Sequence, residues 1–376
     1  MKANILIVGD IVNTRNSNSF IDIELQEIIK EQDFSICNFE APIEGDYAKF
    51  QKVGLNISQK KETTQILKKS GFDMLLLANN HMYDYGHEGL ESTLSSAKEH
   101  QLDVIGAGES YSEAYKPMIK EFNGLKIGFV NASEAQFGAL DESNLYQSSG
   151  YAWVNHPLID ETIIELKDKV DKIIVCIHAG LENYPIPLTQ WKARYRNLCD
   201  LGADAIIGSH PHVPQGFEIY KKKPIFYSIG NFYFDTASFA NSADHSFSVI
   251  LKITKEKILF DFIYHYKLDG EVKLSNKIDV PFNFKDLNKQ LENDIEIEKM
   301  YIDAYRNITR RMFASIYNSY LPGDTLLQFI KKTILKFIYL SKLKIRREFL
   351  LQHLCRNETY RWVTVTAIEL LNRKKH

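Results

Sequence analysis

The stretch that most constrains the fold is Gly71–Gly86, with the sequence GFDMLLLANNHMYDYG. Its apolar run Met74–Ala78 has the length and density typical of a strand buried on both faces of a sheet. The run ends abruptly at Asn79-Asn80-His81, where such a strand leaves the core. In open α/β folds, ligands bind at this edge, outside the carboxyl ends of the strands. Taken alone, the tripeptide is equally consistent with an ordinary loop, because asparagine tolerates turn geometry.

The same pattern, an apolar run followed by polar residues of metal-ligand type, recurs along the chain. Helical patterns separate several of these runs, which predicts an α/β fold with helices covering a sheet. Hairpins follow in the second half, the first marked by Asn123-Gly124, so we expect two packed sheets flanked by helices. The runs and the residues after them are Asn4–Gly9 with Asp10, Phe34–Asn38 with Glu40, Lys172–Ile177 with His178, and Ala203–Ile207 with His210 and His212.

Three local expectations follow from the same patterns. Asp10 is expected immediately beyond the first strand. Leu102–Gly108 reads as one strand that ends in a glycine-rich turn. Glu134–Trp153, which contains glycine and serine, is expected to be an irregular loop over the site.

Length and composition limit the class of protein. At 376 residues the chain can form a large domain with an appendage, which we place at 1–280 with a helical C-terminal extension at 281–376. The net charge of −2 shows no bias toward nucleic acid, and we expect no nucleic-acid partner. The 4 cysteines form no CxxC pair, which indicates free thiols in a reducing compartment.

The chain shows no pattern of a membrane span or an export signal. No segment approaches the roughly 18 uncharged apolar residues that a span requires, and Ile5–Val8 is too short for a signal peptide. We therefore expect a cytoplasmic or membrane-peripheral protein. A basic amphipathic pattern at 326–351 suits contact with an anionic membrane or a synthase complex, but also a helix packed on the main domain with its lysines in solvent.

The polar residues after the strands form a mixed set of oxygen and nitrogen donors. Such a set suits Mn, Fe, Zn or Mg rather than Ca or a thiolate zinc site. Six donors exceed one tetrahedral site, which favours two metals that share a carboxylate. Pro211 favours an extended His210, which would turn both histidines of His210-Pro211-His212 to one side of the chain. The alternative for each single histidine is a hydrogen-bonded structural role. The candidate ligands are Asp10, Glu40, Asn80, His178, His210 and His212.

Taken together, these motifs resemble the CapA-type family, which is named for capsule and poly-γ-glutamate synthesis and is a divergent branch of the calcineurin-like metallophosphoesterases. The resemblance covers about residues 4–268 and implies a four-layer α/β/β/α metallophosphatase-like sandwich. The motifs that carry it are GD at Gly9-Asp10, NFE at Asn38–Glu40, the stretch Gly71–Gly86, HAGLE at His178–Glu182, GSHPHVPQGFE at 208–218 and YSIGNFYFD at 227–235.

The resemblance also implies roles for individual residues. Asp10 and His212 would bind one metal, Asn80, His178 and His210 the other, and Glu40 would join the two. His81 would steady the transition state or protonate the leaving group, with Asp84 orienting it. The residues implied to contact substrate, or to lie just behind those that do, are Asn38, Asn79, Glu182, Asn231 and Asp235.

The chain also departs from the phosphoesterase pattern, and two hypotheses result. Phosphoesterases usually carry a histidine two residues after the first aspartate, where this chain has Val12. The first hypothesis is a metal-dependent hydrolase or transferase that uses metal-activated water on an anionic cell-envelope polymer or its precursor. The second is a non-catalytic accessory subunit of a membrane-associated polymer-synthesis complex, docked through 326–351.

Overall fold

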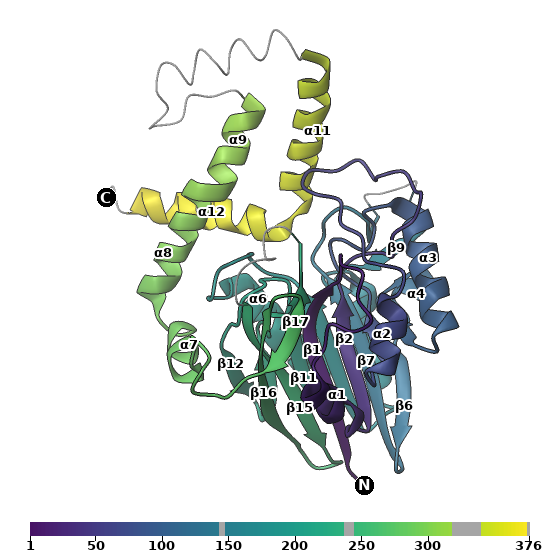
Figure 1. The fold of residues 1–376 in the computed structure, drawn as a ribbon. Helices are drawn as coiled ribbons and strands as arrows, with labels where there is room; N and C mark the ends of the chain where they lie inside the picture. The colour runs from purple at the N-terminus through teal and green to yellow at the C-terminus, as the bar shows by residue number, and fades with distance from the viewer. Residues whose placement is uncertain (143–146, 237–243, 318–339, 374–376) are drawn as a thin grey trace. The chain divides into compact units, whose positions relative to one another are not determined.

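The structure is a computed structural model (Figure 1) that describes residues 1–142, 147–236, 244–317 and 340–373. The chain separates into two compact units. The larger unit comprises Met1–Phe50 and Asn56–Glu292, and the smaller comprises Gln51–Leu55 and Asn293–His376.

The larger unit contains an eight-stranded sheet in the order β17-β16-β15-β1-β2-β3-β4, with β14 pairing with β1. Strands β1 to β4 and β14 run parallel to their neighbours in this set, whereas β15, β16 and β17 are antiparallel. The strands are β1 Ala3–Val12, β2 Phe34–Phe39, β3 Met74–Leu76, β4 Asp103–Ile105, β14 Asn231–Phe234, β15 Asp244–Ile253, β16 Ile258–Leu268 and β17 Glu271–Leu274.

A second sheet has six strands in the order β12-β13-β11-β10-β7-β6, and a small third sheet has the order β5-β9-β8. The predicted hairpin turn at Asn123-Gly124 joins β6 to β7, with φ of 52° and 80° at its two residues. The strands are β6 Met118–Phe122, β7 Leu125–Ser133, β10 Lys172–His178, β11 Ala205–Ser209, β12 Phe217–Tyr220, β13 Lys223–Phe226, β5 Ala107–Gly108, β8 Ala139–Leu140 and β9 Gly150–Ala152.

Alternate residues of the strands build two different cores. Ile5 and Ile7 of β1 pack with residues of the second sheet such as Phe129, so the two sheets bury one face of each against the other. Leu6 and Val8 pack instead with the helices α1, α2 and α3. Helices α5 and α6 contact strands of the second sheet. The predicted four-layer α/β/β/α sandwich is therefore confirmed. These helices are α1 Ile23–Lys30, α2 Thr63–Lys69, α3 Gly86–Glu99, α5 Pro157–Leu166 and α6 Thr189–Leu201, and a short α4 spans Tyr111–Ala114.

Every regular element that the structure describes beyond residue 283 is a helix, as predicted. The predicted basic helix lies partly outside the described residues, which resume at 340 with α11. Within the described part of the chain, no helix has the length and apolar character that crossing a bilayer requires. The helices are α7 Phe284–Gln290, α8 Asp294–Ala304, the π-helical η1 Tyr305–Thr309, α9 Arg310–Tyr317, α11 Leu340–Arg356 and α12 Glu358–Arg373.

The three local expectations were wrong. Asp10 lies inside β1, because pairing with β14 extends that strand to Val12 through a register shift after Asp10. Leu102–Gly108 is divided at Gly106, where a φ of 92° turns the chain from one sheet into another. Glu134–Trp153 contains β8 and β9, whose pairing with β5 supplies the hydrogen bonds that the irregular composition does not reveal.

Candidate metal centre

A close backbone contact positions Asp10. Its N–H donates to Gly230 O at 3.3 Å, and β14 pairs alongside it. A Cβ placed on Gly9 would lie 1.8 Å from the same Gly230 oxygen, so only glycine permits this approach. Gly9-Asp10 of β1 and Gly230-Asn231, where β14 begins, therefore lie side by side.

Three donors that are distant in sequence meet at His178, the last residue of β10. The Nε2 atom of His178 lies 3.0 Å from Asn80 Oδ1 and 3.0 Å from His210 Nδ1. It also lies 3.4 Å from Glu40 Oε1. Asn80 follows β3 of the first sheet and His210 follows β11 of the second, so the ends of both sheets contribute to this group.

A second group gathers around Asp10. The Oδ2 atom of Asp10 lies 3.4 Å from His212 Nδ1, and His212 Nε2 lies 3.9 Å from Glu40 Oε1. Glu40 therefore contacts both groups. All six predicted ligands are buried in one cluster, and the carboxylates of Asp10 and Glu40 each lie within charge-pair distance of both His178 and His212.

The chemistry of this cluster fits divalent cations. Both carboxylate oxygens of Glu40 are buried and have no hydrogen-bond partner among the described residues. Desolvating a carboxylate without a partner is costly unless a cation binds it. Ligand atoms of Glu40, His178 and His210, and those of Asp10, Glu40 and His212, lie within 4.8 Å of one another in each triplet. Two cation positions that share Glu40 are therefore compatible with the structure.

Burial and charge shift the pKa values of these groups in opposite directions. Burial, assisted by the charge of Asp10, raises the pKa of Glu40 well above its ordinary value. Burial lowers the pKa of His178 to about 3. Burial also acts to lower the pKa of His212, but the charges of Glu40 and Asp10 outweigh it and raise this pKa to about 10. Burial therefore makes the negative charge of Glu40 costly in the absence of a cation.

The His-Pro-His segment reaches the cluster in a different way from the one predicted. His210 has a φ of 95° and His212 a φ of 60°, so neither residue is extended. The rings still face one cluster, with centroids 6.0 Å apart. A positive φ is uncommon for a residue with a side chain, and strain of this kind gathers at functional sites. The extended geometry inferred from Pro211 was therefore wrong.

His81 and Asp84 form a hydrogen-bonded pair beside the cluster. The Nδ1 atom of His81 lies 2.7 Å from Asp84 Oδ2, and the same oxygen accepts from Ile57 N at 2.7 Å. Asp84 is buried, whereas the His81 side chain is 14% exposed. Burial lowers the pKa of both His178 and His210, and the neighbouring His81 ring adds a smaller effect in the same direction. This imidazole is thus oriented by a carboxylate and lies near the candidate ligands.

The residues implied to contact substrate differ in their surroundings. Asn38 is buried; its Nδ2 donates to Asp10 Oδ1 at 2.7 Å and lies 3.1 Å from His178 Nδ1. Asn79 is also buried, donates to Phe39 O and accepts from the His81 N–H, so it shapes the turn that carries Asn80 and His81. The side chain of Glu182 is 43% exposed and lies 3.9 Å from His210 Nε2.

Asn231 and Asp235 lie on or beside β14. Asn231 Oδ1 lies 2.9 Å from His212 Nδ1, and its amide donates to Asp244. Asp235 accepts from the N–H and hydroxyl of Thr14 and pairs with Arg15, so it holds the loop after β1.

Sequence reasoning missed three polar residues at the site. Ser209 Oγ lies 3.2 Å from His178 Nδ1, although it stands inside a quoted motif. Asp244 lies behind Asn231, and no sequence pattern marks it. Glu134 follows the apolar strand β7 and lies 3.6 Å from His210 Nε2. The pattern that found the other ligands, an apolar run ending in a polar residue, also fits Glu134.

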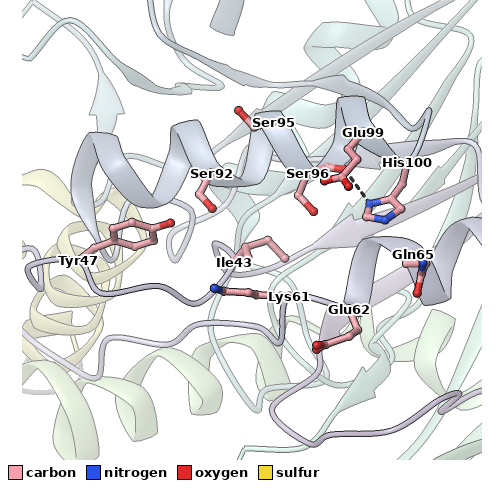
Figure 2. Close-up of a pocket in the computed structure, with 10 residues that line it drawn as sticks. All are labelled: Ile43, Tyr47, Lys61, Glu62, Gln65, Ser92, Ser95, Ser96, Glu99 and His100. Carbon is pink, nitrogen blue, oxygen red and sulfur yellow. Dashed lines mark hydrogen bonds between the residues drawn. The ribbon is translucent and has the colours of Figure 1, made fainter.

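A groove between α2 and α3 lies apart from this cluster (Figure 2). Its lining is mostly polar, with Lys61, Glu62 and Glu99 as its charged residues. Its imidazole, His100, is engaged through Nδ1 with Thr64 Oγ1 at 3.0 Å and Ser96 O at 2.9 Å. None of the candidate ligands lines this groove, so the strand-end cluster remains the candidate site.

Comparison with known proteins supports the family resemblance that the sequence motifs indicate. The chain is 36% identical over 238 residues to the capsule biosynthesis protein CapA of Bacillus anthracis, and the match covers 61% of this chain and 56% of the relative. It is 34% identical over 217 residues to the PGA biosynthesis protein CapA of Bacillus subtilis, covering 56% of each. The chain thus spans little more than half the length of these relatives.

Among solved structures, the calcineurin-like phosphoesterase YfkN from Bacillus subtilis is similar with a TM-score of 0.42 and 18% identity, over 73% of this chain and 88% of that chain. The family model described as bacterial capsule synthesis protein PGA_cap matches residues 5–236, which include every candidate metal ligand. The chain therefore belongs to the PGA_cap family of bacterial capsule synthesis proteins.

Proposed function

We propose that this chain is a divalent-metal-dependent hydrolase or transferase that acts on an anionic cell-envelope polymer or its precursor in capsule or poly-γ-glutamate biosynthesis. The observation that supports it most is Glu40, a buried carboxylate with no hydrogen-bond partner among the described residues that contacts both ligand groups. The substrate class follows from the names of the Bacillus relatives.

In this proposal, the residues of the cluster have the following roles. Asp10 and His212 would hold one cation, Asn80, His178 and His210 would hold another, and Glu40 would be shared. Bound cations would supply a water of lowered pKa and stabilise negative charge that develops on a phosphoryl or carbonyl oxygen. Asn38 holds the Asp10 carboxylate in place through a hydrogen bond and lies against the Nδ1 edge of the His178 ring.

His81 is the proposed general acid. With Nδ1 paired to Asp84, Nε2 is the ring atom that would donate a proton to the leaving group. The buried Asp84 carboxylate fixes the ring orientation, as an orienting carboxylate does in other acid–base pairs.

Turnover of chromogenic substrates tests this proposal. A phosphodiester and a γ-glutamyl anilide, each assayed with Mn²⁺, Fe²⁺, Zn²⁺ and Mg²⁺, separate phosphorus from carbonyl chemistry. His81→Ala is expected to lower kcat by about 10²-fold or more while metal content is retained, and His87→Ala, an exposed histidine of α3, serves as the matched control. Undiminished turnover in His81→Ala would remove this residue from the mechanism.

One observation favours an accessory function as the second candidate. Val12, at the position where phosphoesterases usually carry a histidine ligand, is fully buried and packs with Ala41 and Phe234. The Asp10 group therefore has an apolar side chain where that ligand would stand. Complementation distinguishes the two functions: if a His81→Ala variant that has lost turnover in vitro still restores polymer synthesis to cells that lack this gene, the chain acts as an accessory subunit rather than an enzyme.

A further inference from the structure

Glu134 is a buried carboxylate next to the candidate metal centre that the proposed mechanism does not use. It is the first residue after β7 and is fully buried. Its Oε2 accepts from Gly180 N at 3.2 Å, and its Oε1 accepts from Gln136 Nε2 at 2.7 Å. Both donors are neutral, so they stabilise the carboxylate less than a cationic partner would.

The same carboxylate faces one edge of the His210 ring. His210 Nε2 lies 3.6 Å from Glu134 Oε1, whereas His210 Nδ1 lies 3.0 Å from His178 Nε2 on the other side. The ring is therefore turned with Nδ1 toward the ligand cluster and Nε2 toward Glu134. A neutral histidine that binds a cation through Nδ1 carries its proton on Nε2, and a carboxylate there fixes both the tautomer and the ring orientation.

Glu134 also fixes the segment that carries His178. Its N–H donates to His178 O at 3.0 Å, and its side chain holds the Gly180 N–H. Gly180 in turn lies against Pro211, since a Cβ there would be 2.9 Å from Pro211 Cγ. One residue thus contacts both chain segments that supply the imidazoles of this ligand group.

We propose that Glu134 is a positioning residue that holds the Nε2–H edge of His210, so that Nδ1 of His210 and Nε2 of His178 are presented to one divalent cation. The inference rests on the proposed function, because it assumes that a cation binds there. It distinguishes Glu134 from Glu182, which faces the same ring nitrogen at 3.9 Å but is 43% exposed and therefore subject to solvent screening.

Calorimetric titration of metal-free protein with Mn²⁺ tests the proposal. Wild type is expected to bind two equivalents, and Glu134→Gln to bind one of them as wild type does and the other about 10- to 100-fold more weakly. Glu134→Asp keeps the charge but shortens the side chain. Its affinity for the second equivalent is expected to lie between those of wild type and Glu134→Gln. Glu165→Gln, at a 67% exposed position of α5, is the matched control and should bind as wild type does.

Electron paramagnetic resonance of the Mn²⁺-loaded proteins gives a second readout. The exchange-coupled signal of a dinuclear centre is expected in wild type and is expected to be replaced by a mononuclear signal in Glu134→Gln at matched metal concentration. If Glu134→Gln does not fold, the same titration and resonance measurements on Glu134→Asp test the inference. Variants that bind both equivalents within twofold of wild type overturn the inference alone, whereas a wild type that binds no metal overturns the proposed function and the inference with it.

Discussion

At the scale of single residues, the geometry of the site depends on a few positions with unusual backbone conformations or very close backbone contacts. Gly9 permits β1 and Gly230 to approach, which places Asp10. His210 and His212 adopt positive φ values that residues with side chains rarely adopt. Sequence patterns predicted which residue types gather at the site but not these conformations, because local sequence does not specify such a φ for a residue with a side chain.

Gly9→Ala is expected to destabilise the fold by about 3 kcal/mol or more, the upper end of overpacking costs, because the new methyl group meets a backbone oxygen rather than a flexible side chain. Gly128→Ala on β7 is the control, since its Cβ would lie 3.2 Å from the end of the Leu166 side chain. It is expected to cost less than about 1.5 kcal/mol. Urea unfolding measures both, and equal effects would contradict the account of Gly9.

His265 of β16 gives the expected pH dependence of stability. Burial lowers the pKa of this histidine to about 3. Below its ordinary pKa of about 6.5, the unfolded chain binds a proton that the folded chain does not, so stability falls as pH falls. The loss is expected to be about 1.4 kcal/mol per pH unit between pH 6 and 3.

Replacing this side chain with glutamine removes its titration from both states. His265→Gln, which keeps a polar group for Ser248, should therefore show a shallower fall in unfolding free energy below pH 6 than wild type. Parallel stability curves for the two proteins over this range would rule out the proposed contribution.

At the scale of elements, the two sheets are joined just below the site by a side chain of β7. Asn131 Oδ1 accepts from Ala78 N at 2.8 Å, and Asn131 Nδ2 donates to Cys176 O at 3.1 Å. Ala78 follows β3 of the first sheet, two residues before Asn80, whereas Cys176 belongs to β10 of the second sheet. Asn131 therefore sets the position of the Asn79–His81 turn relative to His178.

Asn131→Ala is expected to cost about 1–3 kcal/mol, because it leaves the buried Ala78 N–H without this acceptor. Asn276→Ala, which removes an exposed hydrogen bond to Asp279, should change stability by no more than about 0.5 kcal/mol. Thermal unfolding of metal-free protein compares the two. A loss for Asn131→Ala as small as that of the control would show that this link between the sheets is unimportant.

Helices and strands that a local sequence pattern specifies were predicted well. Strands that form only by pairing with a distant segment of the chain were predicted poorly. Helix α6 ends at Gly202, which has a φ of 149°, and a glycine at the end of a helical pattern is a stop signal that the sequence itself shows. The strands β5, β8 and β9 could not be found in the sequence, because each is very short and is stabilised by a partner elsewhere in the chain. Glu134 was missed for a different reason: it was assigned to a loop, although it directly follows the apolar strand β7.

At the scale of the whole molecule, residues between 10 and 212 converge because the carboxyl ends of parallel strands in both sheets meet at one edge. Their convergence was predictable from the repeated strand pattern and the family motifs. The pairing of each donor with its neighbours was not, since it depends on the packing of one sheet against the other.

A cation held by both sheets should stabilise the fold. At a Mn²⁺ concentration of 100 times its dissociation constant, the expected gain is about 2.7 kcal/mol. Differential scanning calorimetry is expected to show a Tm that rises with Mn²⁺ and returns to the metal-free value with a chelator. Glu40→Gln should abolish most of this rise in Tm. A wild-type Tm that does not change with Mn²⁺ would contradict a metal site that spans the two sheets.

Anomalous diffraction from crystals grown with Mn²⁺ tests the central claim most directly. The account predicts two peaks in the cluster, one beside Asp10 and His212 and one beside Asn80, His178 and His210, with the Glu40 carboxylate touching both. Crystals that show no manganese at these residues, or an ion that does not touch Glu40, would contradict it.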